Sequence, residues 1–467
     1  MGSVTTSHEL FEVRRIAIIG AGPSGLAAAK YLIAEDSYEQ LDVYEQQPEV
    51  GGVWFYSPEI VGVTPVPHTT PRGPPELPIW PKGSPAPLFS NPMYQHLNTN
   101  IPKPLMQYSD QNFDSQSRLF PSRQDVQTYL IKYSQDVRHL IKFFTQVADV
   151  HLVSKDGKDH WELTSRSIIT EEQKTVEYDA VIVANGHYSV PFIPAVQGIE
   201  AFNAAYPSTI IHSKAYRSPD AFKNNKVIVI GSAASGLDIG TQISKVCRKP
   251  LLNSVKTSSE LKLEQENKEE VPPIAEYLVD ERAVRFEDGR IEKDIDAIVY
   301  CTGYLYSYPF LKSMEPPIVT NGRRVRDTYE QLFHINHPTL AFTALPQKSI
   351  PFPLSEAQAA AIAKVWANKL ALPSKLKMIE FEEKRIEELG DGAGFHVLGF
   401  PNDARYINFM YDWVKTANDG FAKEPARWGS ELVHLRERYQ EVRKKFVEAG
   451  GQAKTLEELG FEFSLKY

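Results

Sequence analysis

The sequence contains little cysteine, no long apolar run and no excess of positive charge. The two cysteines among its 467 residues, Cys247 and Cys301, cannot build a disulfide framework and form no CxxC redox pair. No stretch of about 18 consecutive apolar residues occurs, so a membrane-spanning helix is not expected. The net charge of −8 argues against a nucleic-acid partner, which requires a basic face. We therefore expect a soluble, cytoplasmic protein with no transmembrane segment, no secretory signal and no bound nucleic acid.

The residues that are present suit a folded protein of several domains. Aromatic residues make up 11% of the chain and charged residues 24%, which is not the composition of a disordered protein. At about 150 residues per domain, the length predicts two to three domains.

Two segments of the chain share a pattern in which an apolar strand ends at a glycine and a helix follows. A short apolar run that stops at glycine is typical of a buried parallel strand. The first unit comprises 16–19, Gly20, a helix over 24–34 and a further strand over 41–45; the second comprises 227–230, Gly231 and a helix over 235–246. Two such units predict an α/β protein with two dinucleotide-binding sheets.

The first glycine loop matches the G-x-G-x-x-G pattern of dinucleotide-binding proteins. Its glycines permit a tight turn, close approach to a pyrophosphate and close packing of helix on strand. The phosphates would then bind at the helix N-terminus, where free N–H groups favour anions. Glu45, 20 residues after the loop, offers a carboxylate to ribose hydroxyls and would repel a 2′-phosphate. We predict that FAD, or another dinucleotide with a free 2′-hydroxyl, contacts Glu45 and the loop residues Gly20, Ala21, Gly22, Pro23, Ser24 and Gly25.

The second loop has alanine at the middle glycine position and a different charge at the position that corresponds to Glu45. The same interval of 20 residues after the loop reaches Lys256, beside Ser254 and Thr257. A cation with neighbouring hydroxyls suits a 2′-phosphate, although lysine lacks the bidentate geometry of arginine. We predict that NADPH is preferred over NADH here and contacts Ser254, Lys256 and the loop residues Gly231, Ser232, Ala233, Ala234, Ser235 and Gly236. The alternative is that Lys256 is a solvated surface lysine.

Two dinucleotide sites in one chain imply hydride transfer between a nicotinamide and a flavin. Disulfide reductases share this arrangement but need a cysteine pair beside the flavin, and Cys247 and Cys301 are 54 residues apart. Oxygen is then the natural acceptor for the reduced flavin. No metal site is predicted.

Residues 58–92 contain 11 of the 33 prolines of the chain. Because proline lacks an N–H and has a fixed φ angle, this stretch cannot form a regular helix or a central strand. It is predicted to be either an ordered surface loop or a rim over a substrate channel.

Three helices are predicted in the last third of the chain. Two of them cover 355–372 and 376–389. The third is amphipathic, since apolar residues recur at spacings of three and four, namely Leu432, Leu435, Tyr439, Val442 and Phe446. We expect this helix to pack on its own domain; a dimer contact is the alternative, and a homodimer is left open.

Further segments resemble the flavin-containing monooxygenase family (class B flavoprotein monooxygenases) and occur in that family's order over nearly the whole chain. They are Gly51–Trp54 (GGVW), 94–110 (YQHLNTNIPKPLMQYSD), Phe120–Arg123 with Tyr129–Leu130, 179–186 (DAVIVANG), Cys301–Phe310 (CTGYLYSYPF), and Pro351–Pro353 with Glu356 and Gln358. Asn185 departs from the usual threonine, and the signature that ends at His212 and Tyr216 has Tyr206 for phenylalanine and Ser208 for glycine. Baeyer–Villiger relatives usually carry tryptophan at the last signature position, so Tyr216 favours a heteroatom-oxygenating member.

The resemblance implies two Rossmann-type domains, one for FAD and one for NADPH, with the NADPH domain inserted in the FAD domain. The expected boundaries are 1–190 for the first part of the FAD domain with its proline-rich insertion 58–92, 191–304 for the NADPH domain, and 305–467 for the second FAD part with the C-terminal helices. The implied cofactors are FAD and NADPH, and the implied co-substrate is O₂.

The family's reaction implies that NADPH reduces FAD and that O₂ adds at the flavin C4a atom to give a hydroperoxide. A soft nucleophilic nitrogen or sulfur atom of a small molecule then takes up the distal oxygen. The protein must exclude water, retain NADP⁺ and donate hydrogen bonds to the peroxide. The resemblance gives this donor role to the amide of Asn100; the alternative is that the amide only caps a local turn.

The resemblance also implies the remaining cofactor contacts. For FAD these are Gly52, Val53, Trp54, Thr99, Asn100, Arg123 and Gln358. Near the NADPH pyrophosphate and ribose it places Ser213 and Tyr216, and it favours His212 as a brace between the domains over a proton-transfer role.

Two other functions fit the same residues. One is a Baeyer–Villiger or N-hydroxylating relative, which conversion of a ketone to a lactone or ester would reveal. The other is a catalytically silent flavoprotein that binds NADP(H) and oxidises it negligibly.

Overall fold

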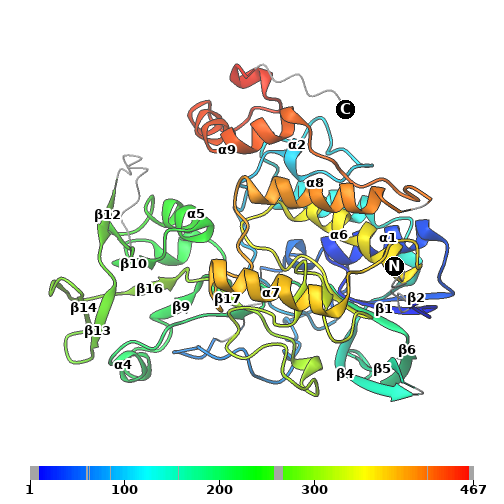
Figure 1. Ribbon diagram of the computed structural model, residues 1–467. Helices are drawn as coiled ribbons and strands as arrows, with labels where there is room; N and C mark the ends of the chain where they lie inside the picture. Colours follow the sequence, from blue (N-terminus) through cyan, green and yellow to red (C-terminus); the bar gives the residue numbers. More distant parts are fainter. Residues whose placement is uncertain are drawn as a thin grey trace.

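The computed structural model describes residues 10–58, 62, 64–84, 86–155, 157–256, 267–417 and 419–461. Within these residues the chain forms two sheets built on parallel strands, with helices packed on them and smaller antiparallel sheets alongside (Figure 1). This architecture confirms the predicted α/β class with two Rossmann-type units.

The first sheet contains the strand that leads into the first glycine loop. Its order is β18-β19-β20-β7-β1-β2-β3, and β1 pairs in parallel with β2 on one side and β7 on the other. The strands are β1 (Arg15–Ile19), β2 (Gln40–Tyr44), β3 (Ile141–Lys142), β7 (Ala180–Val183), β18 (Thr328–Tyr329), β19 (Phe333–His334) and β20 (Leu340–Phe342).

The second sheet is wholly parallel, in the order β12-β11-β10-β16-β9. Its strands are β9 (Ile210–His212), β10 (Val227–Ile230), β11 (Leu251–Ser254), β12 (Lys268–Val271) and β16 (Ala297–Tyr300). All five lie in the sequence between β7 and β18, so the second sheet is inserted between strands of the first. The boundaries at residues 190 and 304 stay predictions.

Three smaller antiparallel sheets complete the strands. They comprise β4 (Thr145–Lys155), β5 (Lys158–Ser167) and β6 (Gln173–Tyr178); β13 (Ile274–Leu278), β14 (Ala283–Phe286) and β15 (Ile291–Glu292); and β8 (Val190–Pro191) with β17 (Tyr304–Leu305). The last pair joins the segment that enters the second sheet to the segment that leaves it.

The predicted helices are all present, with some shifted ends. The α-helices are α1 (Pro23–Glu35), α2 (Lys103–Met106), α3 (Arg123–Tyr133), α4 (Ile199–Ala205), α5 (Ala234–Ile243), α6 (Pro351–Trp366), α7 (Lys375–Leu389), α8 (Asn402–Lys415) and α9 (Ser430–Glu448). Short 3₁₀ turns are η1 (Gly52–Trp54), η2 (Arg138–Leu140), η3 (Ser213–Ala215), η4 (Pro219–Phe222), η5 (Pro309–Leu311) and η6 (Glu457–Leu459). In the described part of the chain, no helix is long and apolar enough to cross a membrane.

Helix α6 ends six residues before the prediction because its C-terminal turn closes early. Asn368 adopts a left-handed φ of 60°, which asparagine tolerates better than most residues. The N–H of Lys369 then bonds back to the carbonyl of Lys364, as in a helix C-cap. The apolar composition that continues to residue 372 therefore packs as a loop.

The core lies on both faces of the first sheet. Ile16 and Ile18 point into a cluster that includes α1, α6, α8 and α9, whereas Ala17 and Ile19 face the β4–β5–β6 sheet. This alternation is the two-residue period of a strand buried on both sides. Figure 1 shows α1, α6 and α8 along one face, and Leu435, Val442 and Phe446 of α9 belong to this core, as predicted.

Candidate functional site

The first glycine loop connects β1 to α1 in a conformation that only glycine allows. Gly20 has a φ of 107°, and a Cβ atom on Gly25 would lie 1.9 Å from the carbonyl oxygen of Gly20. Gly22 caps α1 without a side-chain hydrogen bond to the first turn, so the first N–H groups of the helix stay free. The loop is thus a preformed anion site at a helix N-terminus.

Gly52 brings the η1 turn against this loop. Its φ is 56°, and a Cβ atom there would approach the Cα of Gly22 to 3.0 Å. The N–H of Gly51 donates to the carbonyl of Ala21 over 3.0 Å. The predicted contacts Gly52, Val53 and Trp54 therefore lie beside the glycine loop.

Glu45 follows β2 and its carboxylate is bonded to the loop itself. Oε2 accepts a hydrogen bond from the N–H of Ala21, and Oε1 accepts one from the N–H of Gln47, each over 2.8 Å. Burial raises the pKa of Glu45 to about 7, while the N–H donors of Gln47, Ala21 and Gln46 lower it. Glu45 also lines the cavity described below, so it can order the loop and meet a ribose.

The second glycine loop repeats this geometry between β10 and α5. Gly231 has a φ of 111°, and a Cβ on Gly236 would lie 2.0 Å from the Gly231 oxygen. Ala233 caps α5 without a side-chain hydrogen bond, so this helix N-terminus is also free. Lys256 is exposed after β11, and it forms no ion pair with a residue that the structure describes. The predicted neighbour Thr257 lies outside the described residues.

One cavity of about 3430 Å³ joins the two loops. The predicted FAD contacts that line this cavity are Gly20, Gly22, Pro23, Ser24, Glu45, Gly52, Val53, Trp54, Thr99 and Asn100. The predicted NADPH contacts that line it are Gly231, Ser232, Ala233, Ala234, Ser235, Ser254 and Lys256. The predicted residues that do not line it are Ala21, Gly25, Arg123, Gln358, Ser213, Tyr216 and Gly236.

Asn100 has the free amide that its predicted role requires. It is half-buried on the cavity wall, and its side chain makes no hydrogen bond to another described residue. Its neighbour Thr99 is buried, and its hydroxyl donates to the carbonyl of Ile101 over 2.9 Å. The local turn is therefore held by Thr99, which leaves the amide of Asn100 for a ligand.

Gln358 and Arg123 lie behind the wall rather than on it. Gln358 is fully buried; its Oε1 accepts from the N–H of Ala344, and its Nε2 donates to the hydroxyl of Tyr406. The guanidinium of Arg123 lies 3.8 Å from the ring centre of Tyr56. Because Ala344 does line the cavity, this hydrogen bond lets Gln358 hold the wall from behind, and its contact with FAD stays a prediction.

Ser213, Tyr216 and His212 are likewise buried. The hydroxyl of Tyr216 donates to Oε1 of Gln242 over 3.0 Å, and the ring packs edge-on against Tyr94. His212 Nδ1 accepts from the N–H of Lys214, so its Nε2–H donates to the carbonyl of Gly303 over 3.0 Å. Burial lowers the pKa of His212 to about 3. A neutral histidine with both nitrogens bonded is suited to bracing, not to proton transfer.

The proline-rich segment forms one wall of the cavity. Its described residues contain no helix or strand, only isolated bridges that pair His68 with Ile193 and Ile79 with Leu88. The carboxylate of Glu76 pairs with Lys214 Nζ over 3.1 Å, and this ammonium also donates to the carbonyl of Ser189. The described part of the segment is therefore a loop that forms a cavity rim, and Glu76 ties it to the η3 turn.

Two further parts of the wall were not anticipated. His187 and Tyr188 follow the carboxyl end of β7, and residues of α9 from Arg436 onward also line the cavity. The position after β7 was a usable signal, since ligands of parallel sheets bind at the carboxyl ends of strands. No local signal marks α9, because its approach depends on how the C-terminal helices pack.

These features fit two dinucleotides. At each loop a Cβ atom would block the turn, a helix N-terminus offers free N–H groups, and a residue of suitable charge lies at the end of the next strand. Cys247 and Cys301 are free and buried, and the carbonyl of Cys301 packs against Gly231.

Comparison with known proteins agrees with this geometry. A family model described as "Flavin-binding monooxygenase-like" matches residues 90–267 and 271–418, and an NAD(P)-binding Rossmann-like domain matches residues 18–70. A thiol-specific monooxygenase of Saccharomyces cerevisiae is 30% identical, with 91% of this chain and 90% of the relative covered. The flavin-containing monooxygenase FMO GS-OX-like 2 of Arabidopsis thaliana is 31% identical, with 88% and 87% covered.

Solved structures have the same fold. S-allyl-L-cysteine S-oxygenase from Allium sativum matches with a TM-score of 0.79 and 25% identity over 97% of this chain and 98% of that one. Tmm from Pelagibacter sp. strain HTCC7211 matches in fold with a TM-score of 0.71 and 23% identity over 93% and 91%. The chain therefore belongs to the flavin-binding monooxygenase-like family and is an oxidoreductase that uses FAD and NADPH.

Proposed function

We propose that the chain catalyses the NADPH- and O₂-dependent oxygenation of a nucleophilic nitrogen or sulfur atom of a small molecule, by the C4a-hydroperoxyflavin route that the family resemblance implies. The observation that carries this proposal is the single cavity that joins both glycine loops and holds the free amide of Asn100 on its wall. Sulfur is the first choice, since the matched yeast enzyme is named as thiol-specific and the matched Allium enzyme as an S-oxygenase.

The side chains of the site divide the binding of two dinucleotides between them. When bound, FAD supplies the redox chemistry, accepting a hydride from NADPH and reacting with O₂. The free N–H groups of α1 and α5 bind the two pyrophosphates. Glu45 accepts hydrogen bonds from ribose hydroxyls, and Lys256 attracts a 2′-phosphate. The opposite charges at equivalent positions therefore make the first site selective for FAD and the second selective for NADPH.

Asn100 supplies the fixed polar contact near the reacting atoms. Its amide N–H can donate to an oxygen that gains negative charge during the reaction, without first breaking a bond inside the protein. A preorganised donor of this kind contributes about 10²–10³ in rate in other enzymes.

Two alternatives make different predictions for products. A Baeyer–Villiger relative would convert a ketone to an ester or lactone, and a silent flavoprotein would bind both cofactors without oxidising NADPH. Tyr216 is buried and does not itself line the cavity, so its identity supports the heteroatom proposal through the family resemblance alone. The cytoplasmic location and the homodimer stay predictions.

The test is rapid mixing of the NADPH-reduced holoenzyme with O₂ in the absence of substrate, followed by absorbance. A long-lived near-ultraviolet band that decays when a thiol or sulfide is added, with one oxygenated product per NADPH, supports the proposal. Decay triggered only by a ketone favours the Baeyer–Villiger alternative. Immediate return of the oxidised flavin spectrum with stoichiometric peroxide, for every nucleophile tried, contradicts it.

A further inference from the structure

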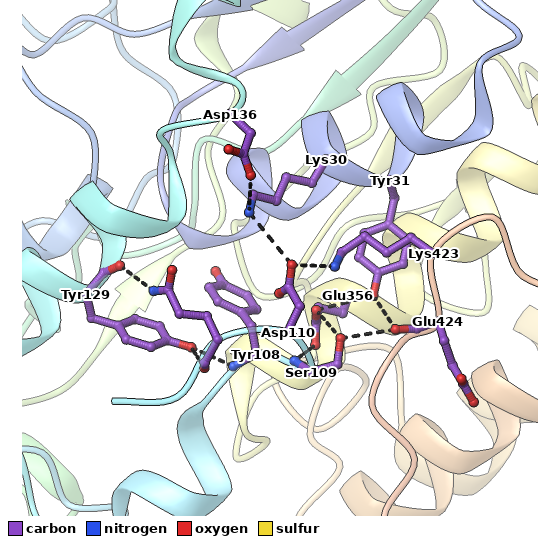
Figure 2. Close-up of polar contacts among 11 residues, drawn as sticks. Lys30, Tyr31, Tyr108, Ser109, Asp110, Tyr129, Asp136, Glu356, Lys423 and Glu424 are labelled. Atoms are coloured by element: carbon purple, nitrogen blue, oxygen red, sulfur yellow. Dashed lines mark hydrogen bonds and ion pairs between the residues drawn. The ribbon is translucent and has the colours of Figure 1, made fainter. Parts of the chain in front are cut away.

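Glu356, on the first turns of α6, is a buried carboxylate that the proposed reaction does not use. Its side chain has no exposed surface. Oε2 accepts a hydrogen bond from the N–H of Ser109 over 2.8 Å, and Oε1 lies 2.9 Å from the hydroxyl of Ser109 and 3.2 Å from that of Tyr31. Figure 2 shows these groups converging from α1, α6 and the segment after α2. No ion pair of Glu356 occurs among the described residues.

Ser109 connects this carboxylate to the first glycine loop. The adjacent residue, Tyr108, donates its hydroxyl proton to the carbonyl of Pro23 over 2.8 Å. Pro23 is the first residue of α1 and part of the loop that is predicted to hold the FAD pyrophosphate. The ring of Tyr108 stacks 5.0 Å from that of Phe352, which lines the cavity. Glu356 therefore holds Ser109, and with it the tyrosine that contacts the loop.

Ion pairs lie near the Glu356 carboxylate, but none of them includes it. Asp110 pairs with Lys423 over 2.6 Å and with Lys30 over 3.8 Å, and Lys30 also pairs with Asp136 (Figure 2). Both ammonium groups thus have carboxylate partners other than Glu356. The charged and titratable groups that interact electrostatically with Glu356 are Tyr31 on α1, Tyr108 and Asp110 after α2, Tyr129 and Tyr133 on α3, and Lys423 after α8. Lys30 on α1 pairs with Asp110.

The surroundings of Glu356 move its own titration toward neutral pH. Burial raises the pKa of Glu356 to about 7, the hydrogen bonds from Ser109 and the charge of Lys423 lower it, and Asp110 raises it. Burial also raises the pKa of the four tyrosines, so they stay neutral. Because the folded value exceeds the ordinary value of 4.5, the folded network favours the protonated carboxyl, and this preference is lost as pH rises through 7.

The proton of Glu356 completes a set of hydrogen bonds. The hydroxyls of Ser109 and Tyr31 each lie within bonding distance of Glu356 Oε1 and also of the carbonyl of Glu424, at 3.0 and 3.2 Å. When the Glu356 carboxylate is ionised, the hydroxyl protons of Ser109 and Tyr31 are the two protons shared between Glu356 Oε1 and the carbonyl of Glu424. A protonated carboxyl donates to one hydroxyl, which frees that hydroxyl's own proton for Glu424. The protonated state therefore adds one hydrogen bond to the network that joins Glu356, Ser109, Tyr31 and the carbonyl of Glu424.

We propose that Glu356 is a positioning residue for FAD, which through Ser109, Tyr108 and Tyr31 holds α1 and its glycine loop in the conformation that binds the cofactor. The clamp, defined as Tyr31, Tyr108, Ser109 and Glu356, weakens when the carboxyl ionises. This proposal rests on FAD binding, which is a property of the family, and does not depend on which substrate atom is oxygenated. Its failure is therefore separate from failure of the proposed reaction.

The test is the rate of FAD release from the holoenzyme between pH 6 and pH 8, followed by the rise in flavin fluorescence. The natural protein should release FAD about fivefold faster at pH 8, the factor that one hydrogen bond supplies. Glu356→Gln should show a smaller pH dependence than the natural protein, because its amide can donate to Ser109 and Tyr31 at any pH. The pH dependence that remains in this variant belongs to Glu45 at the glycine loop, whose pKa burial also raises to about 7. Ser109→Ala should release FAD faster at both pH values.

Glu382→Gln is the matched control. Glu382 is also buried, and burial raises its pKa, but it lies on α7 and bonds to Arg324 over 2.7 Å. Its variant should keep the pH dependence of the natural protein. A flat profile of the natural protein, an unchanged pH dependence in Glu356→Gln, or a profile flattened equally by Glu382→Gln would overturn the proposal. If Glu356→Gln fails to fold, unchanged FAD release in Ser109→Ala also overturns it.

Discussion

Gly236→Ala should weaken NADPH binding while leaving FAD in place. The new Cβ would lie 2.0 Å from the carbonyl oxygen of Gly231 and 2.8 Å from its carbon, where ordinary contact begins at 3.4 Å. Both groups are backbone, so no side chain can move aside, and α5 must shift away from the strand that carries the loop. Overpacking of this kind costs about 1–3 kcal/mol. If this cost falls on the NADPH-bound state, the affinity for NADPH drops by roughly 5- to 150-fold.

The assay is anaerobic reduction of the bound flavin at increasing NADPH concentration. The half-saturating NADPH concentration should rise at least about fivefold, while the flavin spectrum of the purified variant shows full FAD occupancy. Gly240→Ala, on the next turn of the same helix, is the control: its Cβ would meet Leu251, Lys268 and Val229 at 3.6–3.9 Å. That variant should bind NADPH normally and gain up to about 1 kcal/mol in stability from helix propensity. Wild-type affinity in Gly236→Ala, or an equal loss in Gly240→Ala, would refute this account of the loop.

Three further results are expected. Asn100→Ala should retain FAD but divert NADPH consumption to hydrogen peroxide, with product formation about 10²–10³ slower; unchanged coupling, measured as product per NADPH, would remove the amide from the mechanism. Lys256→Glu should raise the KM for NADPH far more than the KM for NADH, and equal effects would exclude a 2′-phosphate contact. His212→Asn should lower the free energy of unfolding at pH 7. This deficit should shrink by about 2 kcal/mol by pH 5, because the natural protein loses stability over that range and the variant does not. The loss arises because the unfolded histidine takes up a proton below pH 6.5, whereas burial holds the folded pKa of His212 near 3. Thermal melts of both proteins across this range measure the difference, and a constant deficit contradicts the assignment.

The geometry of the glycine loops could be predicted from the sequence because its cause is local. Gly20, Gly25, Gly231 and Gly236 are required by backbone geometry within a few residues, so the motif and the structural need coincide. Glu45 lies at the end of the next strand, where the fold fixes its distance from the loop. The place of residues that belong to larger motifs depends on tertiary packing. Gln358 is buried behind Ala344, because a helix position specifies a face only when the packing of that helix is known.

The sequence by itself determined the α/β class, the two glycine loops, the charge beside each of them and the family. These features follow from the periodicity of apolar residues and from backbone conformations that residues close together in the sequence determine. Only the tertiary structure decided that the proline-rich segment forms a cavity wall, that α9 reaches the same cavity, and that Glu356 meets Ser109 and Tyr31. Those contacts join residues separated by hundreds of positions. They depend on how α1 and α6 pack and on the balance between desolvation and hydrogen bonding inside that packing, which no local pattern encodes.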